Sequence, residues 1–455
     1  MDSSAPSSSA AGTSLPPGPA HRPWHTIHAI LHPDDALADL QKRYGDPFCT
    51  RAISGPTVVT CSPQGARCLL TADPDNFGVA DPELTLPLLG DKSLLLISGE
   101  THRAERKLLG PPFHGDRMRA YGGLMRDIAR KYAAALPLHT PFRAIDTTQA
   151  ISLEVILRAV FGVESDRLDG FRQVIIDLVA AFGPLIIFFR QLRRPLFGLG
   201  PWDRFIMQRD LLDRMLDDEM SRRTTEPKER NDILSLLMAA RQEDGTPLPR
   251  NQLRDELVTL LFAGHETTGL SLSWALYHLL RSPQTLLKLR QELAEHPQAV
   301  ASQPDVLTQL PYLSAVCSET LRLHPLAPII PPRLLQRPFE FLGYKLPAGI
   351  KLTVATMRLH KREDLYPEPL AFRPERFIGH TFSPFEYMPF GGGIRRCLGA
   401  AFAMYEMKIV LATLISSCRL ELASDEPVYE VRRNAVMAPS NGVKLIVKER
   451  LSTAS

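Results

Sequence analysis

The chain has 455 residues, of which 44% are hydrophobic and 23% are charged, and its formal net charge is +3. This is the composition of an ordinary globular protein with enough apolar residues for a large core. The small net charge gives no support to nucleic acid as a partner, because proteins that bind nucleic acid usually carry a clear excess of basic residues.

Residues 1–14 are rich in Ser and Ala and lack the basic start and apolar stretch of a signal peptide. They predict a disordered N-terminal arm, followed by a single domain over 15–455. No later window reaches the roughly 18 apolar residues of a membrane-spanning helix. The six cysteines form no CxxC pair or Cys/His cluster and favour a reducing compartment. We therefore expect a soluble, cytoplasmic protein without an integral membrane anchor.

In chain order, the run Pro56–Cys61 predicts a strand, and helical periodicity dominates from about residue 100 to residue 325. Two segments interrupt the helices. Phe182–Trp202 is apolar and basic, which fits either a buried connection packed on the core or a mobile lid over a substrate entrance. Thr224–Asn231 is charged and predicts a solvent-exposed loop.

Proline-rich irregular structure is expected from about residue 326 to residue 395, with a hairpin at Gly343–Gly349. A last helix is expected from about Leu398 to Ser416. The fold class predicted from this order is mainly α with a smaller β portion, and the chain has no internal repeat.

A long helix is predicted from Pro249 to about Arg281, and 263–268 near its middle reads Ala-Gly-His-Glu-Thr-Thr. Glycine and two adjacent threonines are poor helix formers. Taken alone, the segment fits a bend induced by threonine next to a solvated acid.

Glu319 and Arg322 lie three residues apart on one face of another predicted helix and can pair. A single pair at this spacing is usually a surface salt bridge of little energetic value. The downstream run 372–377, Phe-Arg-Pro-Glu-Arg-Phe, adds Arg376 as a third charged group.

The most informative segment is 390–399, Phe-Gly-Gly-Gly-Ile-Arg-Arg-Cys-Leu-Gly. Its glycines permit close approach of the backbone to a bulky partner, and a predicted helix begins just after Cys397. A helix N-terminus favours a thiolate, which can be a nucleophile, a redox centre or a metal ligand. A phosphate-binding glycine loop does not fit, because Arg396 occupies the third glycine position of that motif and no apolar strand precedes it.

The spacing of Phe390, Gly393, Arg395, Cys397 and Gly399 resembles the haem-binding signature of the cytochrome P450 family. The resemblance extends from about Leu15 to Val447. It implies haem b sandwiched between the long central helix and the helix that follows the cysteine loop, with Cys397 as the axial ligand to iron. Cysteine ligation donates electron density to the iron and favours cleavage of the O–O bond.

The other two motifs also resemble family elements and take their roles from that resemblance. Ala263 and Gly264 would let the cofactor and O2 lie against the central helix. Thr267 would hydrogen-bond the bound O2, with Glu266 helping to relay protons. His265 is interpreted as a packing residue or a substrate neighbour, not as a ligand. Glu319, Arg322 and Arg376 would form a buried network that supports the cysteine loop.

The resemblance also implies which residues bind the haem propionates and the substrate. The basic candidates for the propionates are His102, Arg106, Arg333 and Arg395. The candidates for substrate contact are Phe262, Ala263, Ala327, Ile329 and Ile330. These positions are predominantly apolar, so we expect a hydrophobic substrate such as a terpenoid, a fatty acid or a steroid.

The function implied is monooxygenation with O2 and NAD(P)H-derived electrons, delivered by a separate ferredoxin or flavodoxin and its reductase. Arg396 and Lys408 would lie near the cysteine side and could dock an acidic redox partner. A peroxide-using or isomerising relative would usually lack the acid–threonine pair. A non-catalytic haem-binding sensor would have no use for that pair.

Overall fold

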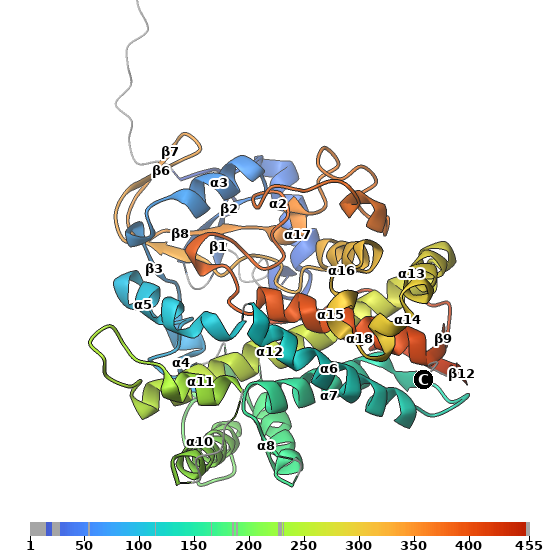
Figure 1. Ribbon diagram of the computed structural model, residues 1–455. Coiled ribbons are helices and arrows are strands. Elements are labelled where there is room, and N and C mark those ends of the chain that lie inside the picture. Colours follow the sequence, from blue (N-terminus) through green and yellow to red (C-terminus); the bar gives the residue numbers. More distant parts are fainter. Residues whose placement is uncertain are drawn as a thin grey trace, which may run out of the picture.

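The computed structural model describes residues 15–20, 28–52, 55–113, 115–164, 166–183, 186–187, 190–225, 230 and 232–451 (Figure 1). The predicted N-terminal arm, residues 1–14, lies outside the described residues. In agreement with the predicted fold class, the described chain is mainly helical and has a smaller β portion.

Helix α12 (Arg250–Arg281) runs through the middle of the molecule in yellow-green (Figure 1). It follows Pro249 and ends at Ser282, directly before Pro283, which cannot continue the helix. It packs against α7 (Ala144–Ala159), α16 (Pro311–Leu323) and α18 (Ala400–Ser417). Because α12 is enclosed by other helices over much of its length, most of its side chains are buried, polar ones included.

The remaining α-helices surround this central group. They are α2 (Pro33–Tyr44), α3 (Pro63–Thr71), α4 (Leu86–Leu89), α5 (Gly99–Leu109), α6 (Asp116–Ala135), α8 (Leu168–Ala181), α10 (Pro201–Thr225), α11 (Ile233–Ala239), α13 (Pro283–Glu295), α14 (Pro297–Ala301), α15 (Pro304–Leu307) and α17 (Thr356–Leu359). Short 3-10 turns connect several of them, including η6 (Gly393–Arg395) in the cysteine loop.

The largest sheet has the strand order β1-β2-β8-β5-β3, and only the β2–β8 pair is parallel. Its strands are β1 (Phe48–Ala52), β2 (Gly55–Thr60), β3 (Phe77–Val79), β5 (Arg333–Leu335) and β8 (Lys351–Val354). The smaller sheets contain β4 (Phe142–Arg143), β12 (Lys444–Arg450) and β9 (Cys418–Leu422); β10 (Glu430–Arg433) and β11 (Val436–Pro439); and β6 (Phe339–Phe341) and β7 (Tyr344–Leu346). The strand predicted at Pro56–Cys61 is thus confirmed as β2.

The predicted hairpin at Gly343–Gly349 is displaced in the structure. The hairpin is formed by β6 and β7, and its turn lies at Leu342 and Gly343, which have φ of +49° and +85°. A two-residue turn of this kind needs positive φ at both central positions, and one glycine satisfies only one of them. Gly349, with φ of +83°, belongs to the next turn before β8.

Helix α18 is long and apolar enough to cross a membrane by length and composition, but 67% of that stretch is buried inside the protein. Its buried side chains include Phe402, Val410 and Leu414, which belong to the main hydrophobic core. The apolar character of α18 is therefore explained by its position in the core.

The Phe182–Trp202 segment combines features of both interpretations offered for it. Phe182 is buried and packs on Phe205 with ring centroids 5.1 Å apart, as expected for a connection on the core. Further along, Phe197 and Leu199 are 102% and 84% exposed. Residues 184–185 and 188–189 lie outside the described part of the segment.

The predicted exposed loop Thr224–Asn231 is only partly described. Thr224 and Thr225 form the last turn of α10, and residues 226–229 and 231 are outside the described ranges. Arg230 departs from the expectation, because its side chain is only 15% exposed. It approaches carboxylates of two other segments, which explains its burial.

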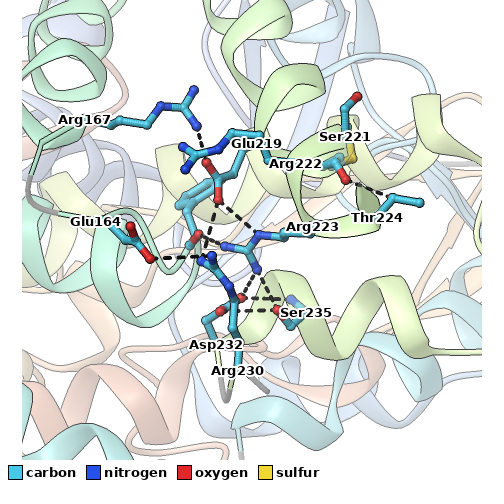
Figure 2. Close-up of polar contacts among 12 residues, drawn as sticks. Glu164, Arg167, Glu219, Ser221, Arg222, Arg223, Thr224, Arg230, Asp232 and Ser235 are labelled. Atoms are coloured by element: carbon cyan, nitrogen blue, oxygen red, sulfur yellow. Dashed lines mark hydrogen bonds and ion pairs between the residues drawn. The ribbon is translucent and has the colours of Figure 1, made fainter. Parts of the chain in front are cut away.

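Arg230 belongs to an ionic cluster between α8, α10 and α11 (Figure 2). At its centre, Arg223 pairs with Glu219 at 3.1 Å and with Asp232, whose carboxylate also caps α11. Arg167 pairs with Glu219 from the start of α8. Arg223, Glu219 and Asp232 are each less than 10% exposed, so the cluster fixes the C-terminal end of α10 with desolvated charges.

Candidate functional site

The cysteine loop is held by its own backbone and by one close approach to α3. The N–H of Cys397 donates to the carbonyl of Phe390 at 2.9 Å, and the N–H of Arg396 donates to Gly393. Gly393 has φ of +63°, and a Cβ there would lie 2.7 Å from the carbonyl oxygen of Leu70. Both facts require glycine at this position.

The sulfur of Cys397 precedes α18, as predicted, and the residue is accessible. Desolvation by neighbouring protein atoms raises the pKa of the Cys397 thiol although the residue is accessible at the surface, whereas the N–H of Gly399 and the charges of Arg106 and Arg396 lower it. A thiol that binds a metal ion loses its proton outright. The accessible cysteine and the flanking cations therefore suit a metal ligand.

The four basic residues predicted to hold propionates lie close together. His102, Arg333 and Arg395 line one small cavity. Burial, together with the charges of Arg395, Arg106 and Arg333, lowers the pKa of His102 to about 4. Burial also lowers the pKa of Arg333 to about 10, with a further contribution from Arg395.

Among the described residues, none of these four side chains forms an ion pair with a carboxylate. Arg333 donates to the carbonyls of Leu69 and Gly392 at 3.4 and 3.2 Å, and Arg395 donates to Ile97. Desolvated guanidinium groups without counter-ions are costly. The cluster therefore suits a ligand with two carboxylates, and the haem propionates fit this requirement.

The middle of α12 carries the predicted oxygen-activating motif. Ala263 is exposed although much of this helix is buried. The absent side chain of Gly264 makes room for Ile156 of α7, because a Cβ there would lie 2.7 Å from Ile156 Cδ1. Thr267 donates its hydroxyl to the carbonyl of Ala263 at 2.7 Å. Ala263 and Thr267 thus share an accessible stretch, while Gly264 sits against α7.

Glu266 has a partner that the sequence motif does not contain. Its Oε1 lies 3.0 Å from Nε of Arg433 at the end of β10. Burial raises the pKa of Glu266, and the charge of Arg433 opposes the increase. His265 is buried, and burial lowers its pKa to about 4, so it is a neutral packing residue rather than a charged one.

The structure brings Glu319, Arg322 and Arg376 together. Arg322 donates to both oxygens of Glu319, at 2.6 and 2.9 Å, and Arg376 Nε lies 3.3 Å from Glu319 Oε1. The backbone N–H of Arg373 donates to the same oxygen at 2.9 Å. Glu319 and Arg322 are 0% exposed, so this is not the surface pair that their spacing alone suggests.

His360 connects this network to the cysteine loop, and sequence reasoning missed it. Its carbonyl accepts from Arg322 at 2.7 Å, and its Nε2 accepts from the backbone N–H of Met388 at 2.9 Å. Met388 stands two residues before Phe390, whose carbonyl binds the N–H of Cys397. No local motif surrounds His360, so only the fold reveals the connection.

The predicted substrate residues are not all alike. Phe262 is half-buried and meets Phe182 edge-on, with ring centroids 6.5 Å apart. Ala327 is exposed, whereas Ile330 is 6% exposed and packs in the core around the largest sheet. Ile329 packs on a separate core cluster beside α2. Ala263 and Ala327 are therefore the exposed members of the set.

Comparison with known proteins agrees with this geometry. The family model described as Cytochrome P450 matches residues 16–447. The chain is 36% identical over 443 residues to cytochrome P450 135B1 of Mycobacterium tuberculosis, covering 95% of this chain and 91% of the relative. It is 32% identical over 417 residues to cytochrome P450 138 of the same species, covering 91% of each chain.

Solved structures give the same result. The retinoic acid-bound cyanobacterial CYP120A1 superposes with a TM-score of 0.85 and 27% identity, covering 97% of this chain and 100% of that one. The haem domain of cytochrome P450DA superposes with a TM-score of 0.84 at 21% identity, covering 96% and 98% of the two chains, and this supports the fold alone.

Proposed function

The chain belongs to the cytochrome P450 family of haem-thiolate monooxygenases, and from this premise we propose that it inserts one atom of O2 into a hydrophobic organic substrate by hydroxylation or epoxidation. The observation that carries the proposal is the Glu266–Thr267 pair beside the accessible Ala263 on α12. An acid and a hydroxyl at adjacent positions can pass protons to a bound oxygen species.

When bound, the haem supplies the iron at which O2 is activated. Cys397 would ligate the iron, and the neutral imidazole of His102 with the guanidinium groups of Arg106, Arg333 and Arg395 would hold the propionates. The Thr267 hydroxyl donates a hydrogen bond to the Ala263 carbonyl. The lone pairs of the hydroxyl oxygen therefore remain free to accept a hydrogen bond. Glu266 would return protons to this position.

The apolar character of the candidate substrate residues, among them Phe262, Ala263 and Ala327, supports a terpenoid, fatty acid or steroid-like substrate. Retinoic acid joins these candidates because a similar solved structure contains it. Electrons would come from a ferredoxin or flavodoxin and its reductase. Arg396 is exposed and suits this docking better than Lys408, which is half-buried and donates to the Thr308 carbonyl at 2.7 Å. We propose a cytoplasmic location on the strength of the bacterial relatives.

The test is an absorption titration of the purified haem protein with terpenoids, fatty acids, steroids and retinoids. We expect a low-spin thiolate-haem spectrum that becomes high-spin with one class, and loss of the thiolate signature in Cys397→Ser. Protein that retains no haem despite adequate supply would contradict the proposal at its base.

Turnover with isotopically labelled O2 and a redox system then separates the remaining candidates. A monooxygenase transfers the label to the product. A peroxide-using enzyme needs only hydrogen peroxide, and an isomerising enzyme gives an unlabelled product. A sensor shows no substrate-dependent consumption of NAD(P)H.

A further inference from the structure

Arg433 contacts the proposed proton-relay acid from an element far away in the chain. Its Nε lies 3.0 Å from Oε1 of Glu266, whose side chain is 12% exposed, while that of Arg433 is 40% exposed. The contact joins the end of β10 to the middle of α12. The family resemblance assigns no role to this arginine, and no local sequence feature points to the pair.

The hairpin that carries Arg433 is docked on α12 by apolar contacts. Arg433 pairs with Val436 across the turn, and Ala438 on β11 packs in one cluster with Leu270 and Ile145. Leu270 lies one helical turn beyond Glu266. The N–H of Met437 also donates to the Leu326 carbonyl at 2.9 Å, next to the accessible Ala327. The hairpin therefore places Arg433 at a fixed position beside the site.

Other polar contacts hold β10 without Arg433. Glu430 binds His324 Nδ1 at 2.7 Å and lies 3.7 Å from Nζ of Lys361. Arg432 donates to the carbonyl of Ile30. Because these contacts are independent of Glu266, replacing the Arg433 side chain should leave the hairpin in place.

We propose that Arg433 is a positioning residue, which keeps the Glu266 carboxylate charged and in place so that it can take up protons for the position beside Thr267. The inference rests on the proposed function, since it assigns a partner to that function's proton relay. A relay acid must be able to lose its proton before it can accept the next one. Burial works against the charged form of Glu266, and the guanidinium of Arg433 offsets part of this effect.

Burial has the largest effect on the pKa of Glu266, and Arg433 is the charged group that opposes it. Among the charged groups of the described residues, Arg433 is the one that acts on Glu266, and its positive charge lowers the pKa of the carboxyl. The adjacent His265 on α12 is neutral because burial lowers its own pKa to about 4. Removing Arg433 therefore leaves burial unopposed, and the carboxyl should remain protonated to higher pH.

The test uses the haem-loaded protein, three arginine variants and a fourth variant, Glu266→Gln. Arg433→Gln removes the charge, Arg433→Lys retains it, and Arg419→Gln, at an exposed arginine on β9, is the control for loss of a positive charge away from Glu266. The first readout is infrared difference titration of the Glu266 carboxyl without turnover, with its band assigned by its loss in Glu266→Gln. We expect a raised pKa in Arg433→Gln and values near the wild type in the other two arginine variants.

The second readout is the ratio of product formed to O2 consumed, measured across pH. In Arg433→Gln we expect the ratio to fall at neutral pH, with peroxide released in place of product. The ratio should recover as the pH is raised. An unchanged infrared titration in Arg433→Gln would overturn the proposal, and so would an equal loss of coupling in Arg419→Gln. If the wild type makes no product with any redox system, the proposed function fails, whereas the infrared titration still reports on the Arg433–Glu266 contact.

Discussion

The hydroxyl of Thr267 illustrates how one residue serves both the helix and the site. It donates a hydrogen bond to the carbonyl of Ala263, four residues earlier, with the two oxygens 2.7 Å apart. Such a bond inside a helix satisfies the hydroxyl donor without requiring another residue. The oxygen keeps its lone pairs for a ligand on the accessible side of α12.

Thr267→Ala should therefore uncouple turnover rather than prevent haem binding. Removing the hydroxyl deletes the acceptor beside Glu266, so we expect product per O2 consumed to fall about 10-fold or more, with peroxide released instead. Product, peroxide and O2 are measured in the same assay. Thr267→Ser, which keeps the hydroxyl, should stay close to wild type. Tightly coupled turnover in Thr267→Ala would remove this residue from the mechanism.

At the scale of elements, ionic contacts join segments that are distant in the chain. The cluster around Arg223 ties α10 to α11 and to the start of α8 (Figure 2). The carbonyl of Phe161 at the end of α7 accepts from the same guanidinium. The side chain of Arg223 is only 4% exposed. Water therefore cannot take its place as a partner of these groups.

Arg223→Gln should destabilise the protein by about 3–5 kcal/mol, because it leaves Glu219 and Asp232 as buried charges without their central partner. Urea denaturation followed by far-ultraviolet circular dichroism measures the change in the free energy of unfolding. Arg222→Gln is the matched control one residue away and should change stability by less than about 1 kcal/mol. Equal stabilities of the two variants would contradict the importance assigned to the cluster.

At the scale of the whole molecule, the core contains carboxyl groups whose charge it cannot accommodate. Glu406 of α18 is 0% exposed. Burial raises its pKa to about 8, with a smaller opposing effect from the Ser152 hydroxyl. In the unfolded chain the same group has a pKa near 4.5. Between these values the folded state holds a proton that the unfolded state has released.

Stability should therefore fall as the pH rises from 4.5 towards 8, by at most about 1.4 kcal/mol per pH unit from this one group. Glu406→Gln removes the titration, so its stability relative to wild type should improve steadily over that range. Denaturant titrations at several pH values measure the difference. The exposed Glu426→Gln should show no such trend, and a constant difference for Glu406→Gln would refute the assignment.

Much of this architecture could be predicted from the sequence because its signals are local. The strand at Pro56–Cys61, the long helix through Glu266 and the helix after Cys397 follow from periodicity and from proline and glycine positions. The hairpin near Gly343 was misplaced because a turn register depends on two backbone angles. Arg433 and His360 could not be found, since their partners come together only when distant segments pack.

The buried carboxylate of Glu319 also has an evolutionary consequence. It accepts from two arginines and one backbone N–H, and no water reaches it. Losing either arginine takes a donor away from a desolvated carboxylate, and losing the carboxylate leaves the buried Arg322 without its acidic partner. Each single substitution in the trio should therefore lower the free energy of unfolding by several kcal/mol. That is a large part of a total stability of about 5–15 kcal/mol. In descendants of this chain, substitutions should accumulate at exposed positions such as Ala327 and Phe197 long before they appear in this trio.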